Sequence, residues 1–356
     1  MGMSKRVIVT IVVYGVLLIA FGALSLSMYI ISQSEESQLA AQRWTYGVDT
    51  ILDEDVKPLR YTQLSAFLYE GIFNEDSVMQ LRSQIDNALT QASINKQSDS
   101  SRLWLDAYSV ETSVRVEGSS AQVTAMGVGG DFFVFHNLPL LAGTYFDSGS
   151  NLLDIVIIDE VLAWQVFGSY NVIGFDIFIS ETPYTVVGVV SREYTDFANE
   201  TYGENPRIYM LYETLNIMNN YNLSITCYEA LLPNPVSNFA MNMLTDNMSV
   251  SDSSVVYREN TSRYSILSLY KSIANYNQRS MSRNNVIFPY WENIAVVKTD
   301  ICTILLLFNT FVLACILAFT IYQIVYIKLT YEITFKNLFK KAEKGYEQVK
   351  FKRKLR

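Results

Sequence analysis

The segment DIVIIDEVLAWQVFG, residues 154–168, carries the clearest structural signals in this chain of 356 residues. Its apolar run between Asp154 and Asp159 is typical of a buried strand. Residues 160–167 are expected to form a helix, and Gly168 is placed to end that helix in the left-handed conformation. A strand that leads directly into a helix indicates a domain in which helices cover a sheet.

Upstream of this segment, the sequence predicts the order strand, helix, strand, strand. The strands are expected at residues 60–69, 103–116 and 121–126, and apolar residues at helical spacing predict a helix over 76–88. Residues 34–56 are polar with spaced apolar positions, which is consistent with a helix that continues out of a membrane span. This order predicts a mixed sheet with helices on one side.

Downstream of the segment, further strands alternate with fewer helices. A hairpin is expected around residues 181–183, with strands at 175–180 and 184–190. The remaining expected elements are strands at 207–211, 223–232 and 253–257, a helix at 236–244, and partly helical chain between 260 and 297.

Two long uncharged stretches lie outside this region, at residues 7–31 and 301–327. Each exceeds the roughly 20 residues that a helix needs to cross a bilayer. A cleaved signal peptide is the alternative for the first stretch, but its apolar core is about 7–15 residues long. Asn309 and Gln323 are the most polar residues of the second stretch, and we interpret them as helix–helix contacts or interfacial positions rather than parts of a transport pathway.

The net charge of −8 is unevenly distributed and predicts the orientation in the membrane. Residues 32–297 contain 31 acidic and 14 basic residues, whereas residues 328–356 contain 10 basic and 3 acidic ones. Lys5 and Arg6 precede the first stretch, and basic residues accumulate on cytoplasmic flanks. The acidic middle region would repel phosphate, so nucleic acid is not an expected partner.

These observations predict a two-pass cell-membrane protein with both termini in the cytoplasm. Its expected parts are a cytoplasmic N-terminus (1–6), a membrane helix (7–31), an extracytoplasmic domain (32–297), a second membrane helix (298–327) and a cytoplasmic tail (328–356). The predicted fold class is an α+β ectodomain, with mixed sheets and helices, between two transmembrane α-helices. Cys227 is the one cysteine in the external region, which excludes an intrachain disulfide there and favours a bacterial surface.

We find no pattern of residues that predicts catalysis, a cofactor or a metal ion. His136 is the only histidine, and it follows three phenylalanines, so we interpret it as the polar end of an aromatic helix. The run from Gly127 to Gly130 lacks the Lys and Ser/Thr of a phosphate-binding loop, and we expect a tight turn before a helix there. The protein is therefore not expected to be an enzyme.

The C-terminal tail has the pattern of a basic amphipathic helix that continues from the second span. Apolar residues recur every three or four positions from Tyr331 to Val349, and basic residues occupy the other faces. Such a helix is expected to lie on the anionic inner leaflet or to dock on a cytoplasmic partner. The residues expected to make these contacts are Lys336, Lys340, Lys341, Lys344, Lys352, Arg353 and Lys354. On the outer side, Tyr290 and Trp291 are expected to be membrane-interface anchors.

A series of short motifs runs through residues 114–190. In order, these are Gly127-Val128 with Asp131-Phe132-Phe133, Leu140-Leu141-Ala142-Gly143 with Phe146, the strand at 156–158, Phe167-Gly168, Ile173-Gly174, and the strand at 184–190 with Gly188. Their order and spacing resemble the MacB-like periplasmic core domain of FtsX-like ABC transporter permeases. The resemblance implies structural roles for Gly127, Phe132, Gly143, Phe146, Phe167, Gly168, Gly174 and Gly188.

The resemblance also implies a function. Permeases of this family dimerise, pair with a separate cytoplasmic ATPase and transmit ATP-driven motion through long helices to the extracytoplasmic domain, which is called mechanotransmission. Their substrates include peptides, antibiotics, lipids and lipoproteins, and some members only activate cell-wall hydrolases. Two features depart from the pattern. The motif Gly-Arg-x-Phe reads Gly143-Thr144-Tyr145-Phe146, and two spans replace the usual four or more.

Two functional hypotheses follow from the resemblance and its departures. In the first, the chain is a membrane subunit of an ABC-type export or mechanotransmission complex, either a reduced permease or an accessory protein. Its expected partners are membrane lipids, a separate ATPase, a multi-span permease or a second copy, and an extracellular peptide or lipid. In the second, the chain is a surface sensor, an immunity protein or a ligand-capturing module without transport.

Overall fold

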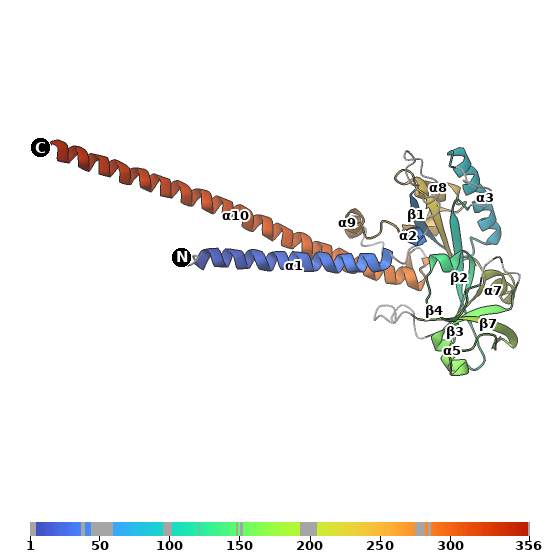
Figure 1. The fold of residues 1–356 in the computed structure, drawn as a ribbon. Coiled ribbons are helices and arrows are strands. Elements are labelled where there is room, and N and C mark those ends of the chain that lie inside the picture. Colours follow the sequence, from blue (N-terminus) through green and yellow to red (C-terminus); the bar gives the residue numbers. More distant parts are fainter. Residues whose placement is uncertain are drawn as a thin grey trace, which may run out of the picture. The chain divides into compact units, whose positions relative to one another are not determined.

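The computed structural model contains two compact units (Figure 1). The sheet unit comprises residues 31–303, and the helix unit comprises residues 1–30 and 304–356. The structure describes residues 5–36, 40–43, 60–94, 102–120, 122–146, 149, 152–192, 205–274, 282–283 and 286–354. The predicted helix over 34–56 falls mostly outside these residues, apart from the end of α1 (Lys5–Glu36) and the short α2 (Ala40–Arg43).

Ten strands of the described chain form one mixed sheet. Their order is β10-β1-β9-β2-β3-β8-β5-β7-β4, with β6 paired to β7. The pairs β3–β8 and β5–β7 are parallel, and the other pairs are antiparallel. The strands are β1 (Tyr61–Leu68), β2 (Leu105–Val114), β3 (Val123–Gly130), β4 (Leu140–Gly143), β5 (Ile155–Asp159), β6 (Asp176–Ile179), β7 (Thr182–Val190), β8 (Arg207–Leu211), β9 (Cys227–Pro233) and β10 (Val255–Glu259).

Four helices cover one face of this sheet and build the larger part of the core. They are α3 (Glu75–Gln91), α5 (Glu160–Phe167), α7 (Tyr212–Met218) and α8 (Phe239–Asn247). Strand residues that alternate along the chain divide between the two faces, as Val156 and Ile158 face these helices while Ile155 and Ile157 face the opposite side.

The opposite face of the sheet packs against α2, α4 (Phe132–Phe135) and the first turns of α10 (Tyr290–Lys354). The predicted layer of helices on one side is therefore complemented by three further segments on the other. Between β10 and α10 lie α9 (Ile266–Ala274) and a small hairpin of β11 (Ser282–Arg283) and β12 (Val286–Ile287). A 3₁₀ turn (η1, Asp252–Ser254) precedes β10.

The β5–α5 segment confirms the strand, helix and cap predicted from residues 154–168. Asp159 ends the strand, and its carboxylate accepts a hydrogen bond of 2.8 Å from the Leu162 backbone N–H at the first turn of α5. Gly168 closes α5 with a φ of 67°, in the left-handed region that favours glycine. Local signals therefore determine both ends of this helix.

The prediction of a tight turn at residues 127–130 is wrong, because these residues belong to strand β3. Gly129 lies directly against the aromatic ring of Tyr108 on the neighbouring strand. A Cβ atom at this position would lie 2.1 Å from a ring carbon. The glycine is therefore required by a close approach across the sheet, and only Gly130, with a φ of 63°, has a turn-like backbone before α4.

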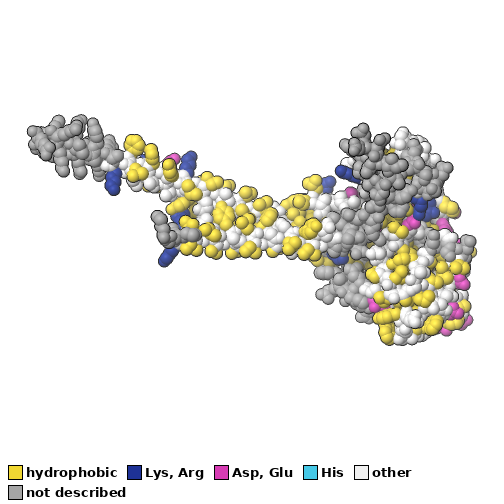
Figure 2. Space-filling model, viewed as in Figure 1, with side chains coloured by type: hydrophobic (Ala, Val, Ile, Leu, Met, Phe, Trp, Pro, Cys, Tyr) yellow, Lys and Arg dark blue, Asp and Glu magenta, His cyan; other side chains and the backbone are white. Residues whose placement is uncertain are grey.

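In the helix unit, α1 and α10 run antiparallel and side by side (Figure 1). Polar side chains join them along their length: Asn309 Nδ2 donates to Ser25 Oγ (2.8 Å), and Gln323 Nε2 donates to Thr10 Oγ1 (3.2 Å). The predicted helix–helix role of Asn309 and Gln323 is confirmed. Both helices contain a stretch long and apolar enough to cross a membrane, and hydrophobic side chains cover this unit (Figure 2).

Candidate functional site

A buried polar cluster lies where the first turns of α10 meet the sheet, and we call it the polar junction. It comprises Ser65, His136, Glu229, Asn260, Arg263 and Glu292. These residues come from β1, the C-cap of α4, β9, the segment after β10, and α10. Strand pairing places Ser65 and Glu229 opposite each other, and their spacing along β1 and β9 turns both side chains toward the face that α10 covers.

Glu229 is the centre of the first half of the junction. Its side chain is 3% exposed, so its carboxylate needs partners that replace water. Ser65 Oγ donates to Glu229 Oε1 (2.9 Å), and Asn260 Nδ2 donates to Ser65 Oγ (2.8 Å). The other carboxylate oxygen meets Nε2 of His136. The predicted position of His136 at the end of an aromatic helix is confirmed, and Glu229 gives that histidine a buried partner.

Glu292, on the first turn of α10, is the centre of the second half. Its side chain is also 3% exposed and is held by two arginines. Arg263 donates to both carboxylate oxygens, with an Nη1···Oε2 distance of 2.8 Å, and Arg258 Nε lies 3.5 Å from Oε1. Such a bidentate pair fixes both position and direction of the carboxylate. The junction therefore attaches the start of α10 to the sheet.

Aromatic rings surround these charges. The His136 ring contacts both Phe132 and Trp291, with ring centroids 4.4 Å from each, and these two rings also contact each other. Tyr290 is buried, and the Arg207 guanidinium lies 4.1 Å from its ring centroid. Both rings pack within the sheet unit at the start of α10, and their expected role as membrane-interface anchors stays a prediction.

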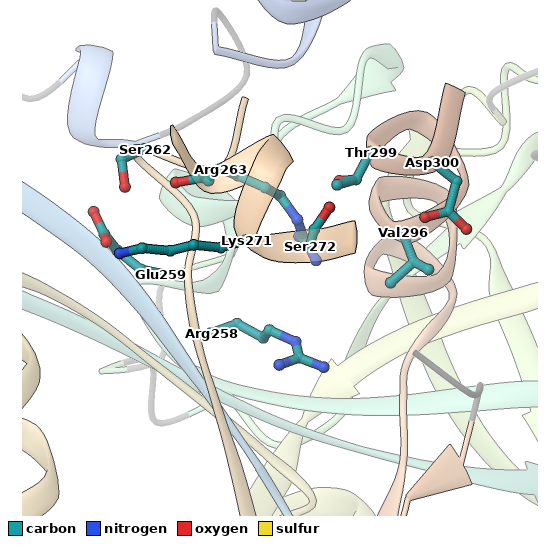
Figure 3. Close-up of a pocket in the computed structure, with 10 residues that line it drawn as sticks. Arg258, Glu259, Ser262, Arg263, Lys271, Ser272, Val296, Thr299 and Asp300 are labelled. Atoms are coloured by element: carbon teal, nitrogen blue, oxygen red, sulfur yellow. The ribbon is translucent and has the colours of Figure 1, made fainter. Parts of the chain in front are cut away.

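Two cavities adjoin the junction. The smaller, of about 120 Å³, lies among the junction residues themselves. The larger, of about 300 Å³, shares Arg263 with it and lies between the end of β10, α9 and α10 (Figure 3). Its lining residues are Arg258, Glu259, Ser262, Arg263, Ser268, Lys271, Ser272, Val296, Thr299 and Asp300. Three cations, two carboxylates and four hydroxyls suit a small polar ligand that carries both charges.

The structure brings some of the motif residues predicted from the sequence close together. Phe132 and Phe146 are buried on the α10 side of the sheet. Gly143, at the end of β4, pairs with Gly188 on β7, and a Cβ on Gly143 would lie 2.1 Å from the Val187 carbonyl oxygen. The other motif positions lie in β3 (Gly127), at the end of α5 (Phe167 and Gly168) and in the turn before β6 (Gly174).

The basic residues of the tail belong to α10, which continues to Lys354. Lys336, Lys340 and Lys341 are exposed, while the side chains of Lys344, Lys352, Arg353 and Lys354 fall outside the described residues. Their contacts with lipid or a cytoplasmic partner stay a prediction. Within the described part of the chain, no three His, Cys, Asp or Glu side chains gather as metal ligands do.

Sequence reasoning did not find Glu229, Arg263 or Glu292. One signal was present, because Glu229 is the only charged residue in the otherwise apolar strand Cys227–Pro233. A charge in a buried strand requires a partner, but the sequence does not say which residue supplies it.

The fold and its flanking helices define a class of protein, an α+β domain of periplasmic type carried by membrane helices. The family model for the MacB-like periplasmic core domain matches residues 15–249. The chain therefore belongs to this family of FtsX-like ABC transporter permeases.

Individual relatives cover less of the chain. The macrolide export ATP-binding/permease protein MacB of Escherichia coli is 29% identical over 156 residues, which are 41% of this chain and 22% of that relative. MacB 2 of Escherichia coli O1:K1 / APEC matches to the same extent. The match thus spans about a fifth of the length of these curated relatives.

Two solved structures align with part of the chain. The periplasmic region of MacB from Actinobacillus actinomycetemcomitans is 16% identical and aligns over 60% of this chain and 92% of its own, with a TM-score of 0.40. The extracellular domain of the noncanonic ABC-type transporter YknZ from Gram-positive bacteria is 13% identical, with 55% and 98% coverage and a TM-score of 0.35.

Proposed function

We propose that this chain is a membrane subunit of an ABC-type export or mechanotransmission complex. In this proposal a separate cytoplasmic subunit hydrolyses ATP, and the sheet unit engages a peptide, a lipid or a partner protein outside the membrane. Membership of the permease family supports the general class, and the structure of α10 is the single observation on which the finer proposal rests.

Helix α10 is a continuous helix of 65 residues. At 1.5 Å per residue this is about 100 Å, far more than a bilayer crossing requires. Its first turn is attached to the sheet through Glu292 and the rings of Tyr290 and Trp291, and its apolar middle contains the predicted span. A continuous helix can transmit a displacement from one end to the other because each turn is hydrogen-bonded to the next.

The distribution of basic residues supports the proposed orientation. Lys5 and Arg6 flank the start of α1, and exposed Lys336, Lys340 and Lys341 follow the apolar part of α10. Basic flanks favour the cytoplasmic side, so both ends lie inside and the sheet unit lies outside. The end of α10 is then the part of the chain that an ATPase or the anionic inner leaflet would contact.

A second candidate function is ligand capture without transport, as in a sensor or immunity protein. The observation that favours it is the larger cavity, whose mixed charges could hold a small zwitterionic or polar ligand without help from another chain. This function predicts ligand binding in the absence of any ATPase, whereas the first function predicts a stable complex with one.

The deciding experiment is purification of the tagged full-length chain from its native membranes in mild detergent. We expect an ATP-hydrolysing subunit, identified by mass spectrometry, to co-purify with the chain at a fixed stoichiometry. The variant K336Q/K340Q/K341Q neutralises three exposed tail lysines without breaking the helix and should lose that subunit. Substitution of Lys5 and Arg6 by Gln is the matched control. Absence of an ATPase, or an association unaffected by the tail variant, would contradict the first function.

A further inference from the structure

Helix α9 has an exposed apolar face. Ile266, Leu267, Tyr270 and Ile273 are exposed, with Ile266 at 59% and Leu267 at 75%. With 3.6 residues per turn these four side chains fall on one side of the helix. An exposed stripe of large apolar residues on a short helix indicates a surface that meets another apolar phase.

The opposite side of α9 is the side that packs. Leu269 is buried, and Ser268, Lys271 and Ser272 line the larger cavity. In Figure 3 this side of α9 faces α10, and the Lys271 side chain extends toward Glu259. Leu269 and the cavity-lining residues therefore face the rest of the sheet unit, and the apolar stripe stays exposed.

A hydrogen bond between α9 and α10 shows which turn of α10 lies next to α9. Ser272 Oγ lies 3.2 Å from Thr303 Oγ1. Asp300 is the last charged residue before the uncharged stretch 301–327, so Thr303 lies two residues inside that stretch. With a rise of 1.5 Å per residue, this contact is about 3 Å beyond the start of the apolar segment. A helix bonded at this level lies beside the point where α10 enters the lipid.

The residue types in the apolar stripe are those found at the boundary between water and lipid. Ile266, Leu267 and Ile273 are aliphatic, and Tyr270 combines an apolar ring with a polar hydroxyl, as rings at the boundary between headgroups and acyl chains do. Amphipathic helices that lie in the membrane plane combine one polar face with one such apolar face.

We infer that α9 is an interfacial helix that inserts Ile266, Leu267, Tyr270 and Ile273 into the outer leaflet of the membrane that α10 crosses. The sheet unit then has a lipid contact in addition to its two membrane helices. The inference depends on the second span and on the external position of the sheet unit, and it is independent of any ATPase partner.

The test uses the full-length chain in vesicles of phosphatidylethanolamine and phosphatidylglycerol. In the variant Leu267→Cys, an environment-sensitive fluorophore is attached to the detergent-solubilised chain before reconstitution. The matched control is Ile217→Cys on α7, a residue of the helix layer that is also exposed (40%) and is expected to stay in water. The unsubstituted chain measures background labelling of its three cysteines.

We expect the label at position 267 to emit at shorter wavelength than the label at 217. Lipids with a nitroxide near the headgroup end of the acyl chain should quench it at least about twofold more strongly. Equal quenching at the two positions would overturn the inference. A blue-shifted label that is not quenched by these lipids would also overturn it, because a second protein copy or a peptide would then cover the stripe.

Discussion

At the residue scale, Asp159 combines a structural role with an electrostatic cost. Its carboxylate caps α5 through the Leu162 N–H, and the residue is 3% exposed. Burial raises the pKa of Asp159 from 3.8 to about 6, although the hydrogen bond from Leu162 and the charges of Arg192 and Arg207 oppose this shift. At neutral pH the ionised carboxylate of Asp159 therefore lowers the stability of the native state.

We expect this cost to appear as a pH dependence of stability. Between pH 4 and 6 the native state keeps a proton that the unfolded chain releases, so the free energy of unfolding decreases as the pH rises through this window. The difference in pKa corresponds to about 3 kcal/mol. Asp159→Asn retains a capping oxygen without the charge and should remove this slope in denaturation of the detergent-solubilised chain. The exposed control Asp246→Asn should retain it, and a persistent slope in Asp159→Asn would contradict the assignment.

At the element scale, the attachment of α10 depends on the pair of Arg263 and Glu292. Arg263→Ala leaves the buried Glu292 carboxylate with Arg258 at 3.5 Å, and we expect a loss of about 3–5 kcal/mol in unfolding free energy. The double variant Arg263→Leu/Glu292→Leu removes both charges and should recover most of that loss. Denaturant unfolding compares Arg263→Leu, Glu292→Leu and the double variant with the unsubstituted chain. A loss in the double variant equal to the sum of the two single losses would show that the two side chains do not act as a pair.

The sequence predicted the elements whose signals are local and missed what depends on long-range pairing. Strand β5, helix α5 and its Gly168 end are specified by neighbouring residues, as is α3, where Asn74 and Ser77 form a reciprocal cap. Helix α7 has only seven residues, too few to show a period. Ser65 and Glu229 are 164 positions apart, and no local pattern contains the strand order that joins them.

At the scale of the whole molecule, α10 continues from one unit into the other, as α1 also does at residue 31. Helix α10 begins in the sheet unit with Tyr290 and continues through residue 304 into the helix unit. Helix α1 pairs with it there through side-chain hydrogen bonds, including Tyr14 OH to Thr320 Oγ1 at 2.8 Å. A signal that passes between the two units along α10 requires the helix to be intact between Glu292 and the apolar stretch.

Val297→Pro tests this requirement, because proline within a helix removes a backbone hydrogen bond and costs about 3 kcal/mol or more. We expect the variant to fold, to insert into the membrane and to keep the proposed ATPase partner, since the polar junction and the tail lie on either side of the break. A fluorophore at Ile217→Cys should respond to ATP in the complex of the unbroken chain and of the control Val297→Ala. The response should disappear in Val297→Pro while ATP hydrolysis continues. If the response survives the break, motion reaches the sheet unit by a route other than α10.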